Sequence, residues 1–380
     1  MPCTIKDSFA IAGVRTTAGA QQWAGYVPEH DAVAVARLRQ AGAVLLGHTN
    51  VPTMLADWQS FNPIFGVTSN PWDLARTPGG SSGGCAAALA AGLTYLSLGS
   101  DIGGSLRVPA HFCGIFAHKP TLNVVPLRGQ IPPAPGTMGP PPTLPVAGPL
   151  ARSATDLLIA LQVLGGPVED ARAYRWTLPP ARAARLADYR IGYVVDDPRC
   201  PLASDVGDVL ARAVDALRKA GATLREGWPD GVNPEQQDRT YRSLLLAALG
   251  FENPTLQQHR AAERERVAAR AAWQAHFRAQ DVFLLPTAFV AAFPHDHRGA
   301  MTSRTLTTPA GPRPYLDLLF WISFATLTGL PATVVPVGLT RDGLPVGLQV
   351  VGPYLEDATP IDVAGRIADV VGGFRRPPAY

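Results

Sequence analysis

Two turns rich in glycine and serine, one at each end of a short apolar helix, constrain the fold of this chain more than any other feature. The first turn, Gly79–Gly84, runs directly into the apolar segment 85–93, whereas a flexible linker would join polar segments. The second turn spans Gly99–Arg107. Glycine-rich turns beside a helix expose backbone N–H groups that can bind an anion, and glycine lets a ligand approach the backbone closely. The two turns therefore suit a serine nucleophile that faces an oxyanion site.

Helix and strand patterns alternate along the chain, which is typical of α/β architecture. Apolar residues at helical spacing predict a helix over Asp31–Ala41 and a strand at Ala43–Leu46. The phrase that joins them recurs at residues 217–222, which indicates one helix-to-strand unit used twice.

Other elements are predicted from capping residues and from β-branched runs between glycine or proline. Two further helices are expected, at Ser153–Leu164 and Ala261–Gln280. Four inner strands are expected, at Arg190–Val195, Val282–Leu285, Ala332–Val337 and Val346–Val350. The proline-rich residues 129–149 predict an irregular connection. Because no linker separates two compositions, we expect one domain over residues 1–380.

Composition excludes several classes of protein. A net charge of +3 over 380 residues gives no argument for binding nucleic acid or an anionic membrane. The four scattered cysteines indicate neither disulfides nor a zinc site and fit a reducing cytoplasm. Glycine and proline interrupt the uncharged residues 318–340, which are interpreted as core and not as a membrane span. His295–His297 is interpreted as a loop, so no metal is expected.

A serine nucleophile needs a base, and the residue types leave two kinds open. The chain has eight histidines, and its 33 basic residues include only three lysines. A lysine, with an ordinary pKa of about 10.4, acts as a base near neutral pH only when burial favours its neutral form. Lys6 lies in an apolar, strand-like segment that could bury it.

The motifs around the two turns resemble those of the amidase signature family of serine hydrolases. They are Gly79–Gly84, Asp101–Pro109 and Lys119–Thr121, and flanking motifs extend the resemblance from Lys6 to Gln349. The resemblance implies one large α/β domain whose central mixed, twisted β-sheet of about eleven strands is covered by helices.

The matching motifs imply roles for three side chains. Ser105 would be the nucleophile, Ser81 a serine on a cis peptide bond, and Lys6 the base behind it. Neutral Lys6 would take a proton from Ser81, which would take one from Ser105 as that serine attacks an amide carbonyl. The N–H groups expected to hold the oxyanion are those of Ile102, Gly103, Gly104 and Ser105.

Other residues are expected to support this triad. Ser82 would contribute hydrogen bonds, and Asp101 and Arg107 would orient the nucleophile turn. Four residues are candidates for the acyl pocket, with core packing as the alternative for each: Met54, Leu55, Trp58 and Trp321. The substrate would be a small amide, ester or carbamate. No cofactor is expected, and a homodimer stays open. The extra motifs of the glutamine-hydrolysing subunit of the tRNA amidotransferase are not recognised, so no tRNA partner is implied.

Two alternatives stay open. Gly80–Gly84 fits the pattern G-x-S-x-G, so Ser82 could be the nucleophile of an α/β-hydrolase-type esterase with a histidine base, although the preceding Leu74–Pro78 is a poor strand. The chain could also be an inactive amidase-like scaffold or binding protein. Family members usually carry several tens of helical residues before the strand with the lysine, and we expect that portion to be missing here. His48 stands where the family most often has lysine, and a structural effect only is expected.

Overall fold

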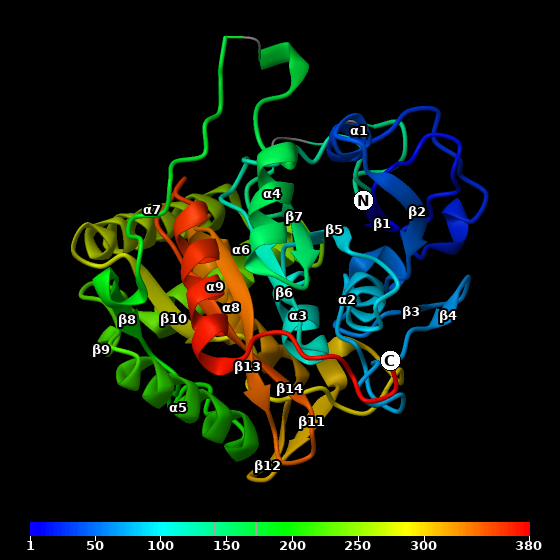
Figure 1. Cartoon of the computed structure of the whole chain (residues 1–380). Helices are drawn as coiled ribbons and strands as arrows, with labels where there is room; N and C mark the ends of the chain where they lie inside the picture. Colours follow the sequence, from blue (N-terminus) through cyan, green and yellow to red (C-terminus); the bar gives the residue numbers. More distant parts are fainter. Residues whose placement is uncertain (138, 140–141, 172) are drawn as a thin grey trace.

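A mixed ten-stranded sheet runs through the computed structural model, which describes residues 1–137, 139, 142–171 and 173–380 (Figure 1). The strand order is β2-β1-β5-β7-β6-β13-β14-β10-β8-β9. The three strands at each end run parallel to one another, and the neighbours between them pair antiparallel. The strands are β1 Pro2–Lys6, β2 Val44–Thr49, β5 Leu96–Asp101, β6 Phe116–Lys119, β7 Val146–Ala151, β8 Arg190–Tyr193, β9 Thr223–Glu226, β10 Val282–Pro286, β13 Ala332–Leu339 and β14 Pro345–Val351. The mixed sheet expected from the sequence is confirmed, with ten strands where about eleven were expected.

Helices cover both faces of this sheet. One face packs against α1 Val33–Gln40, α4 Ala154–Leu164, α5 Ser204–Lys219 and α9 Ala358–Val371, and Figure 1 shows α4 and the red α9 on its near side. The other face packs against α2 Gly83–Ala90, α3 Arg107–Cys113, α6 Pro234–Ala248, α7 Leu256–Ala279 and α8 Leu319–Thr328. Burial on both faces explains why the inner strands read as continuous apolar runs. In β10, Val282 faces the first core and Phe283 the second.

The smaller elements lie in the connections between these layers. Two short hairpins pair β3 Phe61–Asn62 with β4 Gly66–Val67, and β11 Thr305–Thr308 with β12 Gly311–Pro314. The 3-10 helices are Gln21–Trp23, Thr53–Leu55, Glu169–Ala171, Leu186–Asp188, Met301–Ser303 and Tyr315–Leu318.

Most predicted elements are confirmed. The repeated unit forms α1–β2 and α5–β9, and Ser153 caps α4 by accepting a hydrogen bond from the Asp156 N–H at 3.1 Å. Helix α7 begins earlier than predicted, because Thr255 and Gln258 form a capping box ahead of it.

The interpretation of residues 129–149 as irregular was wrong at its C-terminal end. Strand β7 begins at Val146 and inserts between β5 and β6, so Gly148 and Pro149 lie inside a central strand. Proline usually occurs in edge strands or bulges, and it therefore misled the prediction. A Cβ atom on Gly148 would lie 2.2 Å from the His118 carbonyl oxygen, so the strand requires glycine here. Residues 138 and 140–141 of this segment lie outside the described residues.

Residues 318–340 form core elements, as predicted. Helix α8 and strand β13 occupy most of this stretch, and every residue of α8 is buried. No helix within the described ranges is long and apolar enough to cross a lipid bilayer.

Candidate active site

Lys6, the last residue of β1, lies completely buried beside the first serine turn. Alternation along β1 turns Ile5 toward the first core and Lys6 toward the opposite face, where α2 packs. The Lys6 Nζ donates to Ser81 Oγ at 2.7 Å and to Ser100 Oγ at 3.0 Å, and its contact with the Ser100 carbonyl oxygen measures 3.4 Å. The strand therefore delivers an amine directly to a serine hydroxyl.

Burial changes the acid–base properties of this amine. It lowers the pKa of Lys6 from its ordinary 10.5 to about 7, against the weaker opposing effects of Cys85 and Asp101. Desolvation acts in this direction because it penalises the charged form of a lysine. Near neutral pH a large fraction of Lys6 is therefore neutral and able to accept a proton.

The first serine turn packs tightly against the chain around it. The peptide bond between Gly80 and Ser81 is cis. A Cβ atom on Gly80 would lie 2.4 Å from the Asp57 carbonyl oxygen, so only glycine fits at this position. Ser81 is 1% exposed, and its hydroxyl accepts the hydrogen bond from Lys6.

Ser82 joins the first turn to the second. Its N–H donates to the Ser105 carbonyl oxygen at 3.2 Å, and its hydroxyl donates to the Ser100 carbonyl oxygen at 3.3 Å. The same hydroxyl accepts a hydrogen bond from the Ser100 N–H at 3.4 Å. Ser82 is completely buried. Its polar groups are therefore used in holding the two turns together.

Ser105 lies in the second turn, just before α3, and is 6% exposed, more than either Lys6 or Ser81. Accessibility thus increases from the amine toward the serine expected to attack a substrate. Among the described residues, no hydrogen bond joins the Ser81 and Ser105 hydroxyls. The hydrogen bonds between the two turns are those that Ser82 makes to Ser100 and Ser105. Catalytic hydrogen bonds are often long in structures without a ligand.

Asp101 and Arg107 fix the second turn from inside. Asp101 accepts hydrogen bonds from the Gly104 N–H at 2.9 Å, from the Leu106 N–H at 3.1 Å and from the Arg107 guanidinium at 2.9 and 3.0 Å. Both charged side chains are completely buried. Burial alone would raise the pKa of Asp101, but the charge and hydrogen bonds of Arg107 hold it below its usual value.

Arg107 connects this turn to the sheet and to α8. It donates to the Ile322 carbonyl oxygen at 2.8 Å, to Thr326 Oγ1 at 2.6 Å and to Gln349 Oε1 at 2.7 Å. These contacts hold the turn in place and support the orienting role that was expected for Asp101 and Arg107, which stays a prediction. Sequence reasoning had not included Gln349 in this network, where it contributes from β14.

One expected oxyanion donor needs correction. The Gly104 N–H already donates to Asp101, so it stabilises the turn and does not face a substrate. This leaves the N–H groups of Ile102, Gly103 and Ser105 as candidate donors.

Two carbonyl groups of the same turn are held by side chains. Tyr241 donates its hydroxyl to the Ile102 carbonyl oxygen, and Trp58 donates its indole N–H to that of Gly103, both at 2.7 Å.

The candidate pocket residues separate into two groups. Trp58 contacts the second turn at the Gly103 carbonyl oxygen. Met54 and Leu55 are half-buried in the neighbouring 3-10 helix, and each has a positive φ. Trp321 is 1% exposed, bonds to the Cys200 carbonyl oxygen and stacks near Trp228, so core packing is the interpretation that its surroundings favour. Tyr241 is the site residue that sequence reasoning missed, because no motif marks it.

The other candidate groups do not join the serines. No histidine among the described residues hydrogen-bonds to Ser81, Ser82 or Ser105, whereas Lys6 bonds to Ser81, so the contacts favour Lys6 over a histidine as the base. Within those residues, no group of three or more His, Cys, Asp or Glu side chains could hold a metal ion. Lys119 donates to the Pro120 carbonyl oxygen, a contact within its own segment.

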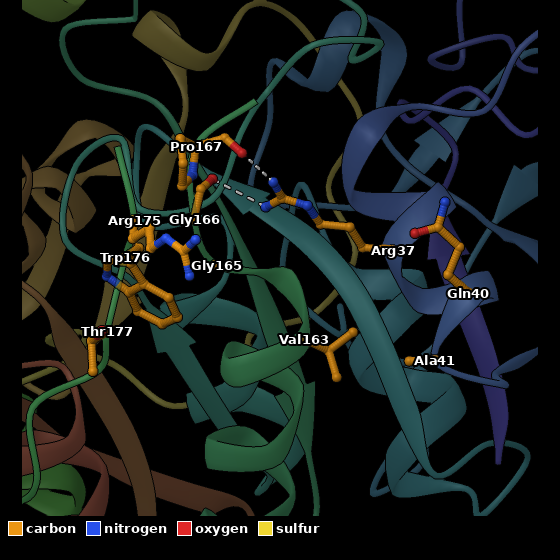
Figure 2. Close-up of a pocket in the computed structure, with 10 residues that line it drawn as sticks. All are labelled: Arg37, Gln40, Ala41, Val163, Gly165, Gly166, Pro167, Arg175, Trp176 and Thr177. Atoms are coloured by element: carbon orange, nitrogen blue, oxygen red, sulfur yellow. Dashed lines mark hydrogen bonds between the residues drawn. The ribbon is translucent and has the colours of Figure 1, made fainter. Parts of the chain in front are cut away.

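A surface pocket lies apart from the serines, between α1 and the chain that follows α4 (Figure 2). Arg37 extends from α1 and donates to the carbonyl oxygens of Gly166 and Pro167 at 3.1 and 2.6 Å. Trp176 lies on the opposite wall of the pocket in Figure 2. We interpret Arg37 as a structural link between α1 and the end of α4.

The fold and the buried Lys6–Ser81 contact fit the amidase-type hydrolase that the motifs imply. A family model described as Amidase matches residues 1–250 and 230–360, and the chain belongs to the amidase signature family of enzymes.

Relatives of known sequence and structure agree with this assignment. The chain is 34% identical to the A-type subunit of the glutamyl-tRNA(Gln) amidotransferase of Thermus thermophilus, over 93% of its own length and 81% of the relative's. The crystal structure of the same subunit from Thermotoga maritima superimposes with a TM-score of 0.84 at 26% identity, over 99% of this chain and 86% of that one. A crystal structure described as an amidase gives a TM-score of 0.77 at 29% identity, over 98% and 85% of the two chains.

Proposed function

We propose that this chain is an amidohydrolase that cleaves the C–N bond of a carboxylic amide through an acyl-enzyme on Ser105. The observation that carries the proposal is the 2.7 Å hydrogen bond from the buried Lys6 amine to Ser81, in the turn that Ser82 ties to Ser105. Membership of a hydrolase family supplies the class of reaction. The contacts of Lys6, Ser81 and Ser82 support the residue roles that the family motifs imply.

The proposed first half-reaction forms the acyl-enzyme. Neutral Lys6 accepts a proton from Ser81, which accepts one from Ser105 as the Ser105 oxygen attacks the carbonyl carbon. The N–H groups of Ile102, Gly103 and Ser105 stabilise the oxyanion, and one such donor is worth roughly 3–4 kcal/mol. Collapse of the tetrahedral intermediate breaks the C–N bond. Ser81 gives a proton to the leaving amine and takes one from Lys6, which becomes neutral again.

The proposed second half-reaction releases the acid. Water attacks the acyl-enzyme as Ser81 takes its proton and passes its own to Lys6. The tetrahedral intermediate then collapses, and the leaving Ser105 oxygen takes a proton back from Lys6 through Ser81, which restores the neutral amine. The same steps would cleave an ester or a carbamate, whose carbonyl carbon offers the same point of attack.

A substrate screen tests this proposal. The wild-type chain is incubated with aliphatic amides, aryl amides, carbamates and esters, and the release of amine or alcohol is measured. We expect turnover of at least one amide, and a loss of roughly 10³-fold or more in Ser105→Ala, because a nucleophile is removed. Ser323→Ala is the matched control, since Ser323 is a buried serine on α8 whose hydroxyl, among the described residues, bonds to the Phe320 carbonyl oxygen alone. Full turnover in Ser105→Ala would refute the proposal, and a folded wild-type chain inactive on every substrate would favour a scaffold.

The names of the relatives favour a second candidate function, that of an A-type subunit in a tRNA amidotransferase. Two of the three relatives described above carry this name. Co-expression with the other subunits of a bacterial amidotransferase discriminates the two candidates. Co-purification of a stable complex, with amide hydrolysis that depends on it, would support the role in an amidotransferase. Full hydrolysis by the isolated chain and no complex would support the free-standing amidohydrolase.

A further inference from the structure

Two consecutive peptide groups of the second serine turn, Gly99–Arg107, are each held by a side chain from a distant part of the sequence. Tyr241, on α6, donates its hydroxyl to the Ile102 carbonyl oxygen at 2.7 Å. Trp58, in the loop after the 3-10 helix Thr53–Leu55, donates its indole N–H to the Gly103 carbonyl oxygen at 2.7 Å. Both residues lie outside the two serine turns.

These two contacts determine where the N–H groups of the turn point. In a planar trans peptide, the carbonyl oxygen and the following N–H point in opposite directions. Holding the Ile102 carbonyl on Tyr241 therefore directs the Gly103 N–H away from α6. Holding the Gly103 carbonyl on Trp58 directs the Gly104 N–H toward Asp101, which accepts it at 2.9 Å. The second peptide group is thus fixed at both ends.

The side chains that make these contacts are themselves fixed. Tyr241 is completely buried, and burial raises the pKa of its hydroxyl, which therefore stays protonated and able to donate. Trp58 is 6% exposed, and its ring lies 5.3 Å from that of Tyr315. The neighbouring Asp57 accepts hydrogen bonds from the Tyr315 hydroxyl and from Arg304, both at 2.6 Å. The segment that carries Trp58 is therefore held by a buried ion pair and a hydroxyl.

The turn is less crowded at Gly103 than at Gly104. A Cβ atom built on Gly103 would have its nearest neighbours at 4.0 Å, the Tyr241 hydroxyl and a methyl group of Leu319. A Cβ atom on Gly104 would lie 3.2 Å from Ile322. The Tyr241 hydroxyl therefore lies beside Gly103 as well as on the Ile102 carbonyl oxygen.

We propose that Tyr241 and Trp58 are positioning residues for the oxyanion site of the Ile102–Ser105 turn. Tyr241 aligns the Gly103 N–H, and Trp58 fixes the next peptide group, whose N–H bonds to Asp101, and so holds the backbone between the Gly103 and Ser105 donors. The inference rests on the proposed amidohydrolase function and deepens it. Neither residue acts on the substrate directly. Each acts through a backbone carbonyl group, so that the donors are aligned before the substrate binds and need no reorganisation during the reaction.

Removing one donor atom at a time tests the proposal kinetically. Tyr241→Phe removes a single hydroxyl, and Trp58→Phe removes the indole N–H but keeps an aromatic ring. We expect kcat to fall roughly 10- to 100-fold in each, less than the loss of a whole oxyanion donor, with KM nearly unchanged. The pH midpoint of kcat should stay where it is in the wild type, because Lys6 is not altered.

Two remote variants serve as matched controls. Tyr189→Phe removes a buried hydroxyl that bonds to Asp362 and to the Ala183 carbonyl oxygen. Trp72→Phe removes an indole N–H that donates to the Cys113 carbonyl oxygen, at the far end of α3. Both should keep the wild-type kcat and lose only thermal stability. A fall in kcat equal to that of the Tyr241 and Trp58 variants would mean a merely structural role and would overturn the proposal.

A structural measurement decides the proposal independently of activity. Crystal structures of Tyr241→Phe and Trp58→Phe should show the Ile102–Gly103 and Gly103–Gly104 peptide groups, respectively, rotated from their wild-type orientation. Unchanged peptide orientations would overturn the proposal. If the wild-type chain hydrolyses no amide, the proposed function fails, and the crystal structures still decide whether the two side chains orient the turn.

Discussion

Lys6 can be buried and can act as a base for the same reason, because its amine can lose its proton and become neutral. Arginine stays charged under all conditions in proteins, whereas a desolvated lysine can become neutral. Burial also lowers the pKa of Lys119 to about 7, yet Lys119 bonds to the Pro120 carbonyl oxygen and Lys6 bonds to a serine hydroxyl. The contact with Ser81, and not burial alone, marks Lys6 as the candidate base.

The pH dependence of activity follows from the pKa of Lys6. Below about pH 7 the amine is protonated and cannot accept a proton from Ser81, so kcat/KM should be low and should rise with pH through a midpoint near 7. Initial rates between pH 5 and 9 measure this midpoint. Lys6→Ala should lower kcat/KM by at least about 10²-fold, the contribution of a general base. Near-normal turnover in Lys6→Ala would indicate a different base.

The motifs around the proposed triad could be recognised in the sequence, because local runs such as Gly79–Gly84 and Asp101–Pro109 carry them. The contacts of Tyr241 and Trp58 could not be predicted from the sequence. Tyr241 lies 139 residues and Trp58 lies 45 residues from the carbonyl group that each one binds. Neither belongs to a local pattern, and only the packing of α6 and of the loop after residue 55 brings them to the turn.

At the scale of elements, local signals predicted helices and strands of typical composition and missed a central strand of atypical composition. Helix α4 begins at its predicted serine cap, and α5 repeats the helix-to-strand unit of α1. Strand β7 was missed because its glycine and proline have non-local causes, such as the close approach of the His118 carbonyl oxygen to Gly148. The pattern of residues within a segment predicts whether that segment is a helix or a strand, but it does not predict which other segments will pack against it.

The cap of α4 gives a prediction for one element. Ser153→Ala should lower the free energy of unfolding by about 1 kcal/mol, because the Asp156 N–H loses its acceptor. Urea denaturation measures this change, and Ser153→Asn, which restores a capping oxygen, should recover most of it. Amide hydrolysis should stay at the wild-type rate, since α4 covers the face of the sheet opposite Lys6. An unchanged unfolding midpoint in Ser153→Ala would contradict the assignment of the cap.

At the scale of the whole molecule, the buried amine couples folding to pH. The pKa of Lys6 is about 7 in the folded state and near its ordinary 10.5 in the unfolded state. Between these two values the unfolded chain binds more protons, so stability rises with pH across that window. Below pH 7 both states are protonated, and the full penalty of a buried charge remains.

Lys6→Met tests this coupling. The variant removes the titrating group, so the stability difference between wild type and variant should change by up to about 1.4 kcal/mol per pH unit between pH 7.5 and 9.5, in favour of the wild type as pH rises. Lys119 is present in both chains, so its own contribution cancels in the difference. Urea unfolding at several pH values measures it, and parallel stability curves would show that Lys6 is not buried as a neutral amine.

Covalent labelling is the direct test of whether Ser105 is the nucleophile and Lys6 is its base. The folded chain is treated with a fluorophosphonate, which modifies activated serines, and the adduct is located by peptide mass spectrometry. We expect an adduct on Ser105, none in Ser105→Ala, and labelling slowed by at least about 10²-fold in Lys6→Ala. An adduct on Ser82, or a folded wild-type chain without any adduct, would contradict this expectation.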